Sequence, residues 1–379
     1  MEKIYFDYAA TTPTDPQVAQ AMAPYFAGQF GNPSSPHSLG QESLAAVENA
    51  RKRIADFIGA KPEEIVFNSG ATEANNHAIF GIARANRAKG NHIILSAIEH
   101  HSVHEPAEQL QKDGFDVTYI RVDENGSIDP MAIEKAITPK TILIGIIHAS
   151  NEIGTVQPVE EIGKIAKAHR ILLLVDAVQT VGHIPVNVDQ LQADLLSFSA
   201  HKFYGPKGIG VLYIRTGTKV APLLFGGDQE KGRRASTQNV PAIVGMAKAI
   251  ELCRKQMAVE AQTQARLRDK LLREVPRRVT GVKVNGERAA RLPNNAHFSF
   301  EHLQGESLLM SLDMANIAAS MGSACTSGAM EPSAVLRAIG LSDELALGSL
   351  RITLGRWTKE EHVDSFLDQL PQLVNSLRI

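Results

Sequence analysis

The chain has 379 residues, 44% of them hydrophobic and 21% charged, which is typical of a globular protein large enough for two lobes. Its 39 basic and 41 acidic residues leave a net charge of −2, so nothing favours a nucleic-acid or anionic-membrane surface. We recognise no export signal and no apolar run of ~18 residues that would cross a bilayer. With only two cysteines, Cys253 and Cys325, we expect free thiols and a cytoplasmic location.

From about residue 60 onward, short apolar runs alternate with longer amphipathic stretches. This alternation predicts an α/β protein whose mostly parallel sheet is covered by helices on both faces. The predicted strands span residues 65–67, 92–95, 117–122, 141–147, 171–175, 195–199 and 209–214. The predicted helices among them span residues 73–88, 102–112 and 159–169.

The pattern changes after about residue 240. A long helical stretch, residues 241–275, has few helix breakers and suits a connection between two lobes. A strand is predicted at residues 296–300, and further helices at residues 306–314, 332–339 and 360–377. We therefore expect a large domain at residues 16–255 and a smaller α+β domain formed by residues 1–15 and 256–379.

Four polar clusters follow predicted strands, beginning at Asn68, Ser150, Asp176 and Ser199. Open α/β sheets bind ligands at such carboxyl ends. The first cluster, Asn68-Ser69-Gly70-Ala71-Thr72-Glu73, opens a helix and suits a phosphate, because Gly70 permits close approach and the helix amides and Thr72 hydroxyl can bind an anion. An ordinary helix capped by Ser69 or Thr72 is the simpler alternative.

Lys202 follows an apolar strand and stands beside Ser199 and His201 at the predicted ligand edge. Carbonyl cofactors are held as Schiff bases by lysines of lowered pKa. Pyridoxal phosphate also needs a carboxylate against its pyridine nitrogen, and Asp176 at the end of strand 171–175 suits that role. A surface lysine and a helix-capping aspartate are the alternatives, but the two residues together favour pyridoxal phosphate.

The stretch Glu99-His100-His101-Ser102-Val103-His104 allows two interpretations. His100 and His104 are four residues apart on a helix and could bind a metal, although a third ligand is not evident. A histidine could instead stack on an aromatic cofactor and shuttle protons. An ordinary surface position fits His104.

Cys325 lies in Met321-Gly322-Ser323-Ala324-Cys325-Thr326-Ser327-Gly328, where six small residues surround the thiol. That composition predicts a mobile loop with an exposed nucleophile. Cys253 has helical apolar neighbours and is predicted to be inert packing. Near the C-terminus, a predicted strand carries Arg351 and Arg356, one of which could clamp a substrate carboxylate bidentately, with surface charge as the alternative.

Together these motifs resemble the cysteine desulfurases, pyridoxal-phosphate enzymes of aminotransferase class V, and in particular the branch that serves iron–sulfur cluster assembly and nitrogenase maturation. The resemblance runs nearly end to end. Its most specific segments are Ser199-Ala200-His201-Lys202-Phe203-Tyr204-Gly205-Pro206-Lys207-Gly208 and Gly322-Ser323-Ala324-Cys325-Thr326-Ser327-Gly328. It implies the type I fold of pyridoxal-phosphate-dependent transferases, with a mobile catalytic-cysteine loop at about residues 321–331 of the smaller domain.

The resemblance also implies roles for individual residues. Lys202 would hold the cofactor and act as general base, His100 would stack on the ring, and Cys325 would take the substrate sulfur as a persulfide. The remaining implied contacts are Asp176 to the pyridine nitrogen, Gln179 to the ring hydroxyl, Ala71, Thr72, Ser199 and His201 to the phosphate, Thr237 to the phosphate of a second subunit, and Asn151 and Arg351 to the substrate carboxylate.

The implied partners are L-cysteine, a second copy of the chain and a sulfur-acceptor protein such as an iron–sulfur scaffold, with no nucleic acid and no membrane. No metal ligand is expected, and a role of Cys325 as ligand to a cluster held by a partner stays open. Two positions depart from the family. Ser236 replaces a usual glycine, which would strain the backbone if its φ is positive, and Asp228 stands where another glycine is common.

Three alternatives compete with a desulfurase. Another class V enzyme, such as a selenocysteine lyase or an aminotransferase, needs no protein thiol, so the Cys325 segment argues against it. A catalytically silent or weak homologue that only binds an assembly scaffold would not need to retain Lys202, Asp176, His100 and Cys325 together. A nicotinamide dehydrogenase would need a Gly-x-Gly-x-x-Gly motif opening a helix, which the sequence lacks.

Overall fold

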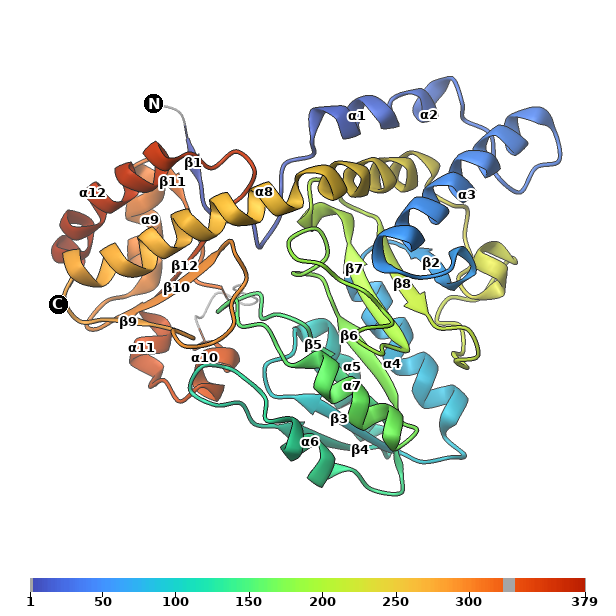
Figure 1. Ribbon diagram of the computed structural model, residues 1–379, viewed down its shortest axis with the longest axis horizontal. Coiled ribbons are helices and arrows are strands. Elements are labelled where there is room, and N and C mark those ends of the chain that lie inside the picture. The colour runs from blue at the N-terminus through green and yellow to red at the C-terminus, as the bar shows by residue number, and fades with distance from the viewer. Residues whose placement is uncertain (1–2, 323–330, 379) are drawn as a thin grey trace.

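The computed structural model describes residues 3–322 and 331–378, and a seven-stranded sheet lies at the centre of its larger group of elements (Figure 1). Only β8 runs antiparallel to its neighbours, so the expected mostly parallel sheet is confirmed. All seven predicted strands are present within about two residues of their predicted ends. In sheet order they are β2 Ile65–Asn68, β8 Gly210–Ile214, β7 Leu195–Ser199, β6 Leu172–Asp176, β5 Thr141–Ile147, β3 His92–Ser96 and β4 Asp116–Ile120.

Helices cover both faces of this sheet because successive strand residues point to opposite sides. Val66 and Leu174 pack with α4 and α5 on one face, whereas Phe67 and Val175 pack with α3, α7 and α8 on the other. The helices of this group are α1 Pro16–Met22, α2 Pro24–Ala27, α3 Ser38–Ile58, α4 Ala71–Asn86, α5 His101–Lys112, α6 Pro130–Ala136 and α7 Val159–Ala168, with 3₁₀ turns η1 Pro62–Glu64, η2 Ala200–Lys202 and η3 Gln229–Gly232.

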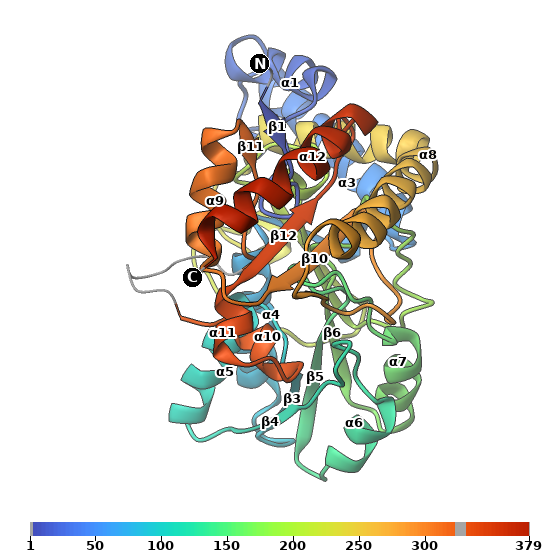
Figure 2. The same cartoon turned by 90° about the vertical axis from the view of Figure 1, so that its left-hand side faces the viewer.

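A second hydrophobic core forms around a smaller antiparallel sheet. Figure 2 shows α12 lying across strands β12 and β10, and Phe298, Leu350 and Phe366 pack together at this contact. The strands are β12 Ser349–Thr353, β10 Asn295–Phe300 and β9 Val282–Val284, beside the parallel pair β1 Ile4–Tyr5 and β11 Ile317–Ala318. The helices are α9 Gly305–Met314, α10 Ala334–Ala338, α11 Asp343–Leu347 and α12 Glu360–Leu377.

One long helix, α8 Val240–Arg278, joins the two cores (Figure 1). Its first half, up to Cys253, packs on the central sheet, and Leu267, Leu271 and Val275 pack in the second core. The predicted long connecting helix is therefore confirmed. The proposed domain boundaries at residues 15/16 and 255/256 stay a prediction. None of the helices within residues 3–322 and 331–378 has the length and apolar character needed to span a membrane.

Candidate active site

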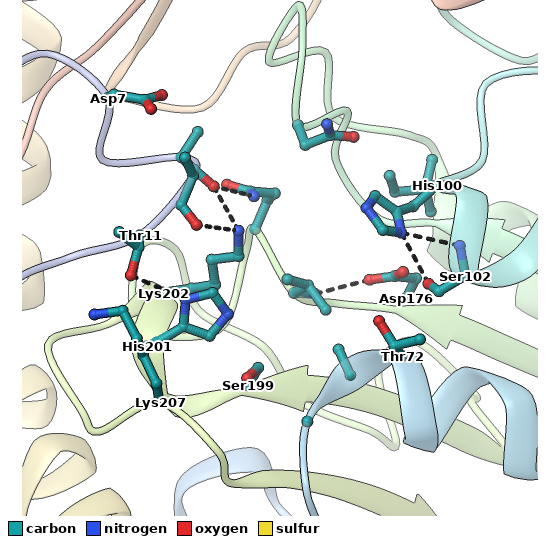
Figure 3. A pocket seen from close by; sticks show the side chains of 18 of the residues that line it. Asp7, Thr11, Thr72, His100, Ser102, Asp176, Ser199, His201, Lys202 and Lys207 are labelled. Carbon is teal, nitrogen blue, oxygen red and sulfur yellow. Dashed lines mark hydrogen bonds between the residues drawn. The ribbon is translucent and has the colours of Figure 1, made fainter. Parts of the chain in front are cut away.

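A cavity of about 730 Å³ lies where the carboxyl ends of the central strands meet the second core (Figure 3). Residues that follow β2, β3, β5, β6 and β7 line it, together with the N-terminal arm and β12. The four polar clusters at the strand ends thus meet in one place. The lining includes the sequence-predicted residues Ala71, Thr72, His100, Asn151, Asp176, Gln179, Ser199, His201, Lys202 and Arg351.

The start of helix α4 forms one end of this cavity. Gly70 is its N-cap residue, and no side chain caps the helix, so the interpretation of a helix capped by Ser69 or Thr72 is wrong. Gly70 has a φ of 155°, a conformation that favours glycine. The backbone of Gly210 also packs closely against Gly70, since a Cβ atom on Gly210 would lie 2.7 Å from the Gly70 Cα atom. Only a glycine at position 210 therefore permits this close contact. The amides of the first helical turn therefore remain available to an anion.

Two further polar side chains border the same end of the cavity (Figure 3). The Ser199 hydroxyl donates to the Ile209 carbonyl at 3.2 Å, and His201 Nδ1 lies 3.1 Å from the Thr11 hydroxyl. Burial lowers the pKa of His201 to about 4, with a smaller contribution from the charge of Lys202. The His201 ring is therefore neutral at physiological pH and can donate one N–H.

Lys202 lies at the end of the 3₁₀ turn that follows β7, and its Nζ atom donates to the carbonyl oxygens of Ala9 at 2.6 Å and Ala10 at 2.8 Å. Burial lowers the pKa of Lys202 to about 8, and the charge of Arg351 lowers it further, while two carboxylates of the cavity wall oppose the shift. A lysine with such a pKa is partly uncharged at physiological pH. Its amine can therefore act as a nucleophile or as a base.

Asp176 ends the neighbouring strand β6 and is only 3% exposed. Its Oδ2 atom accepts a hydrogen bond from Asn75 Nδ2 at 2.8 Å, and its Oδ1 atom accepts one from the Val178 amide at 3.0 Å. Both neighbours are donors, which is the environment that a carboxylate anion requires when it is buried.

His100 is the N-cap residue of α5 and lines the cavity. Its Nδ1 atom accepts the Ser102 amide at 3.1 Å and lies 2.9 Å from the Ser102 hydroxyl. His104 instead stacks on Tyr119, with ring centroids 5.1 Å apart. No group of three potential metal ligands occurs among the residues that the structure describes, so the metal interpretation of His100 and His104 finds no third ligand there.

Arg351 reaches the cavity from strand β12, and its side chain is 4% exposed. Its Nη2 atom donates to Asp7 Oδ1 at 2.7 Å and its Nη1 atom donates to the Asn151 carbonyl at 2.9 Å. These bonds fix the plane of the guanidinium and bring it next to Asn151, the other residue predicted to contact a substrate carboxylate.

Arg356, the second candidate for a carboxylate clamp, lies elsewhere. Strand β12 ends at Thr353, so the expectation that one strand carries both arginines was wrong. Arg356 forms ion pairs with Asp15 and Glu260, each at 2.6 Å. It therefore ties the chain start to α8 and does not line the cavity.

Thr237 is exposed and does not line the cavity. Cys325 lies outside the described residues, so its role stays a prediction. Gln179 lines the cavity and donates to the Ala9 carbonyl at 3.0 Å. The predicted packing position of Cys253 is confirmed, since the residue is buried, and burial raises the pKa of its thiol to about 12, which favours the unreactive thiol form.

The two departures from the family differ in their backbone geometry. Ser236 has a φ of 96°, so the strain expected for a serine at a glycine position is present. Asp228 has a φ of −81°, which any residue adopts. Only the first substitution therefore strains the backbone.

Three polar residues that the sequence analysis did not single out contribute to the site. Asp7 pairs with Arg351, Asn75 contacts Asp176, and Ser102 contacts His100. Asn75 lies four residues after Ala71 on α4, so helical spacing could have found it. No local signal could have found Asp7, because its partner lies 344 residues further along the chain.

These features fit pyridoxal phosphate on the structure's own terms. An uncapped helix start suits the phosphate, a buried carboxylate with one donor on each oxygen and lone pairs to spare suits the pyridine nitrogen, and an amine with a pKa of about 8 suits the aldehyde. Combined with the mostly parallel sheet, the site defines a pyridoxal-phosphate-dependent enzyme.

Comparison with known proteins agrees with this class. The sequence model of aminotransferase class V matches residues 4–366. The cysteine desulfurase IscS of Dictyoglomus turgidum is 54% identical over 376 residues, which cover 99% of this chain and 95% of that relative. The solved structure of a NifS-like protein has a TM-score of 0.93 at 37% identity, covering 99% of this chain and 100% of the other. The structure of SspA in complex with cysteine has a TM-score of 0.83 at 39% identity, covering 93% and 98%.

The chain therefore belongs to the aminotransferase class-V family, and its cofactor is pyridoxal 5′-phosphate. The expected type I fold is confirmed as well, since the likeness to the NifS-like protein extends over nearly the whole chain.

Proposed function

We propose that this protein is a cysteine desulfurase that supplies sulfur for iron–sulfur clusters or other sulfur-containing cofactors. It converts L-cysteine to L-alanine and holds the sulfur as a persulfide on Cys325. The observation that carries this proposal is that Lys202, Asp176 and Arg351 line one cavity. These side chains supply an amine for the cofactor, an acid for its ring and a cation for the carboxylate of an amino acid.

The cofactor supplies an electron-poor ring that stabilises negative charge on the substrate carbon. Asp176 would keep the pyridine nitrogen protonated, His100 would stack on the ring, and Gln179 would donate to the ring hydroxyl. The phosphate is bound at the uncapped start of α4 by Ala71 and Thr72, together with Ser199 and His201.

The substrate is oriented through its carboxylate. Arg351 presents its guanidinium next to Asn151, so a carboxylate at this end of the cavity can bond to both side chains. Lys202 would hold the cofactor through its amine, and its Nζ atom would take the α proton of cysteine. Its lowered pKa supports this role, because a base must be uncharged to accept a proton.

Cys325 receives the sulfur. Its thiolate attacks the substrate sulfur, an S–S bond forms, and the carbon–sulfur bond of the substrate breaks. The electrons of that bond stay with the carbon, which takes up a proton and becomes the methyl group of alanine. L-cysteine and the enzyme thiol thus give L-alanine and the enzyme persulfide, and no external oxidant is needed.

The protein acts as a homodimer in the cytoplasm and passes its sulfur to an acceptor such as an iron–sulfur scaffold protein. Thr237 reaches the cofactor phosphate in the second subunit, which is consistent with its exposure outside its own cavity. Phe225, which precedes this segment in the chain, is 79% exposed, as expected of an apolar side chain that a second subunit would cover. By its position in the sequence, Cys325 belongs to the predicted smaller domain of residues 1–15 and 256–379.

The test is to incubate the purified protein with L-cysteine and a reductant and to measure alanine and sulfide. Equal amounts of both are expected. Cys325→Ser should keep the visible absorbance of the cofactor and lose persulfide formation, whereas Cys253→Ala, the matched control, should retain it. Sulfide release by Cys325→Ser at the normal rate would show that Cys325 is not the nucleophile. Conversion of selenocysteine but not cysteine would favour a selenocysteine lyase.

A further inference from the structure

A chain of hydrogen bonds joins Asp176 to His100 through two residues to which no role has been assigned. Asn75 Nδ2 donates to Asp176 Oδ2 at 2.8 Å and to Ser102 Oγ at 2.9 Å, which uses both protons of the amide. The Ser102 hydroxyl therefore accepts from Asn75, and its own proton is left for His100 Nδ1 at 2.9 Å. The Ser102 amide donates to the same nitrogen at 3.1 Å (Figure 3).

The direction of each bond in this chain is fixed by Asp176. A carboxylate oxygen can only accept, so the nitrogen of the Asn75 amide must face it, and a flipped amide would bring two oxygens together. Asn75 is fully buried, and its Oδ1 atom has no hydrogen-bond partner within the described part of the chain. The amide is thus held on its donor side only.

Two donors on one ring nitrogen settle the tautomer of His100. Nδ1 uses its lone pair to accept, so it carries no proton, and the single ring proton lies on Nε2. The surroundings of the ring also act on the pKa of His100. Burial lowers the pKa of His100 most, Lys202 and His101 lower it further, and Asp176 alone of these raises it.

We propose that Asn75 and Ser102 are positioning residues that keep His100 neutral, with its proton on Nε2, beside an anionic Asp176; this rests on the proposed function. If Asp176 bonded directly to His100, its negative charge would raise the pKa of the ring and favour the protonated imidazolium. The Asn75 amide prevents this because it offers a donor to each side. A neutral His100 stacks on a protonated pyridine ring without charge repulsion, and its Nε2–H remains available for proton transfer.

The test is nuclear magnetic resonance of the cofactor-loaded protein labelled with ¹⁵N-histidine, with His100→Gln used to assign the signal. In the wild-type protein we expect a protonated Nε2 and an unprotonated Nδ1. Ser102→Ala removes one donor from Nδ1 and should raise the pKa of His100 by about half a unit to one unit. Ser102→Thr restores the hydroxyl and should return the pKa to its wild-type value.

Asn75→Asp should also raise the pKa of His100, because the new carboxyl group can accept the Ser102 proton and so takes a donor away from Nδ1. Two carboxylates in contact share one proton, so with Asp176 beside it the rise should be similar to that in Ser102→Ala, about half a unit to one unit. Asn76→Asp is the matched control, since among the described residues the Asn76 amide donates to the backbone carbonyls of Thr72 and Ser102 and not to Asp176. It should leave the His100 tautomer unchanged.

The spectra are recorded without substrate, so they are independent of desulfurase activity. A protein that shows the expected spectra but does not convert cysteine would disprove the proposed function alone. A wild-type proton on Nδ1, or a His100 pKa that is unchanged in both Ser102→Ala and Asn75→Asp, would disprove the role of Asn75 and Ser102 while leaving the desulfurase assignment untouched.

Discussion

Arg351 Nη2 lies 2.7 Å from Asp7 Oδ1, so the guanidinium proposed to bind the substrate carboxylate also pairs with a carboxylate of the protein itself. Asp7 lies in the N-terminal arm and Arg351 on β12, so the pair also fixes the arm against the second core. The same Asp7 charge acts on Lys202 across the cavity, where it raises the pKa of the amine.

Replacing Asp7 should therefore change the pKa of Lys202. In Asp7→Asn the raising effect is lost, and the pKa of Lys202 should fall below its wild-type value of about 8. The uncharged amine captures the cofactor, so the rate at which cofactor-free protein gains visible absorbance should rise with pH around this pKa. The midpoint of that profile should move to lower pH in Asp7→Asn. Asp313→Asn, which breaks the exposed pair with Lys3, is the control, and an upward shift in Asp7→Asn would contradict the electrostatic argument.

The carboxylate of Asp176 should be essential for turnover but not for the fold. Asp176→Asn keeps the shape of the side chain and removes the charge that holds the pyridine nitrogen protonated. Alanine formation at saturating cofactor should fall by at least about 100-fold, the scale seen when one electrostatic contact to a reacting group is removed. Asp189→Asn removes an exposed partner of Arg215 and should leave the rate unchanged. A fall of less than tenfold in Asp176→Asn would argue against its contact with the ring.

Glu99 should make the protein less stable as the pH rises. Its carboxyl accepts the Ile147 amide at 2.7 Å and bonds to the Ser96 hydroxyl, and burial raises its pKa to about 8. The folded protein therefore keeps a proton that the unfolded chain releases above its ordinary pKa of 4.5. Between these two values the free energy of unfolding should fall by roughly 1 kcal/mol per pH unit from this residue.

Denaturant unfolding at several pH values tests this expectation. Glu99→Gln is always neutral and keeps an oxygen for the Ile147 amide, so its stability should depend less on pH than that of the wild type over this window. Glu105→Gln, at an exposed position on α5, should retain the wild-type slope. Parallel profiles for wild type and Glu99→Gln would mean that Glu99 is ionised in the folded protein.

Replacing Ser236 by glycine should stabilise the folded protein. Its φ of 96° strains any residue with a Cβ atom, so Ser236→Gly should raise the free energy of unfolding by about 1 kcal/mol. Ser236→Ala keeps the Cβ atom and should give no gain. Denaturant midpoints of both variants measure the difference, and equal midpoints would place the strain elsewhere.

The sequence predicts the central sheet well because buried parallel strands are short apolar runs that stand out from their amphipathic neighbours. Lys202 and Asp176 could be singled out for the same reason, since each follows such a run. Helix α3, Ser38–Ile58, was not predicted, although Val47, Ile54 and Ile58 face the core at helical spacing. Its glycine and many charged residues weaken the apolar pattern.

The hydrogen-bond network of the cavity could not be predicted in the same way. Asn75 meets Asp176 across 101 residues and Ser102 across 27, so its role depends on how α4 packs against β6 and α5. A buried asparagine has no sequence signal that distinguishes it from an exposed one. Such residues become visible only when the fold brings their partners together.

The cavity wall is built from both parts of the molecule. Asp176 ends β6 and Lys202 lies in the turn after β7, whereas Arg351 lies on β12 of the smaller sheet and Ser320 pairs with it. Gentle heating that melts only the smaller core would dismantle the face that recognises the amino acid and leave the cofactor attached. A preparation could then stay yellow after it has lost its ability to select cysteine, so its colour would overstate the fraction of working enzyme.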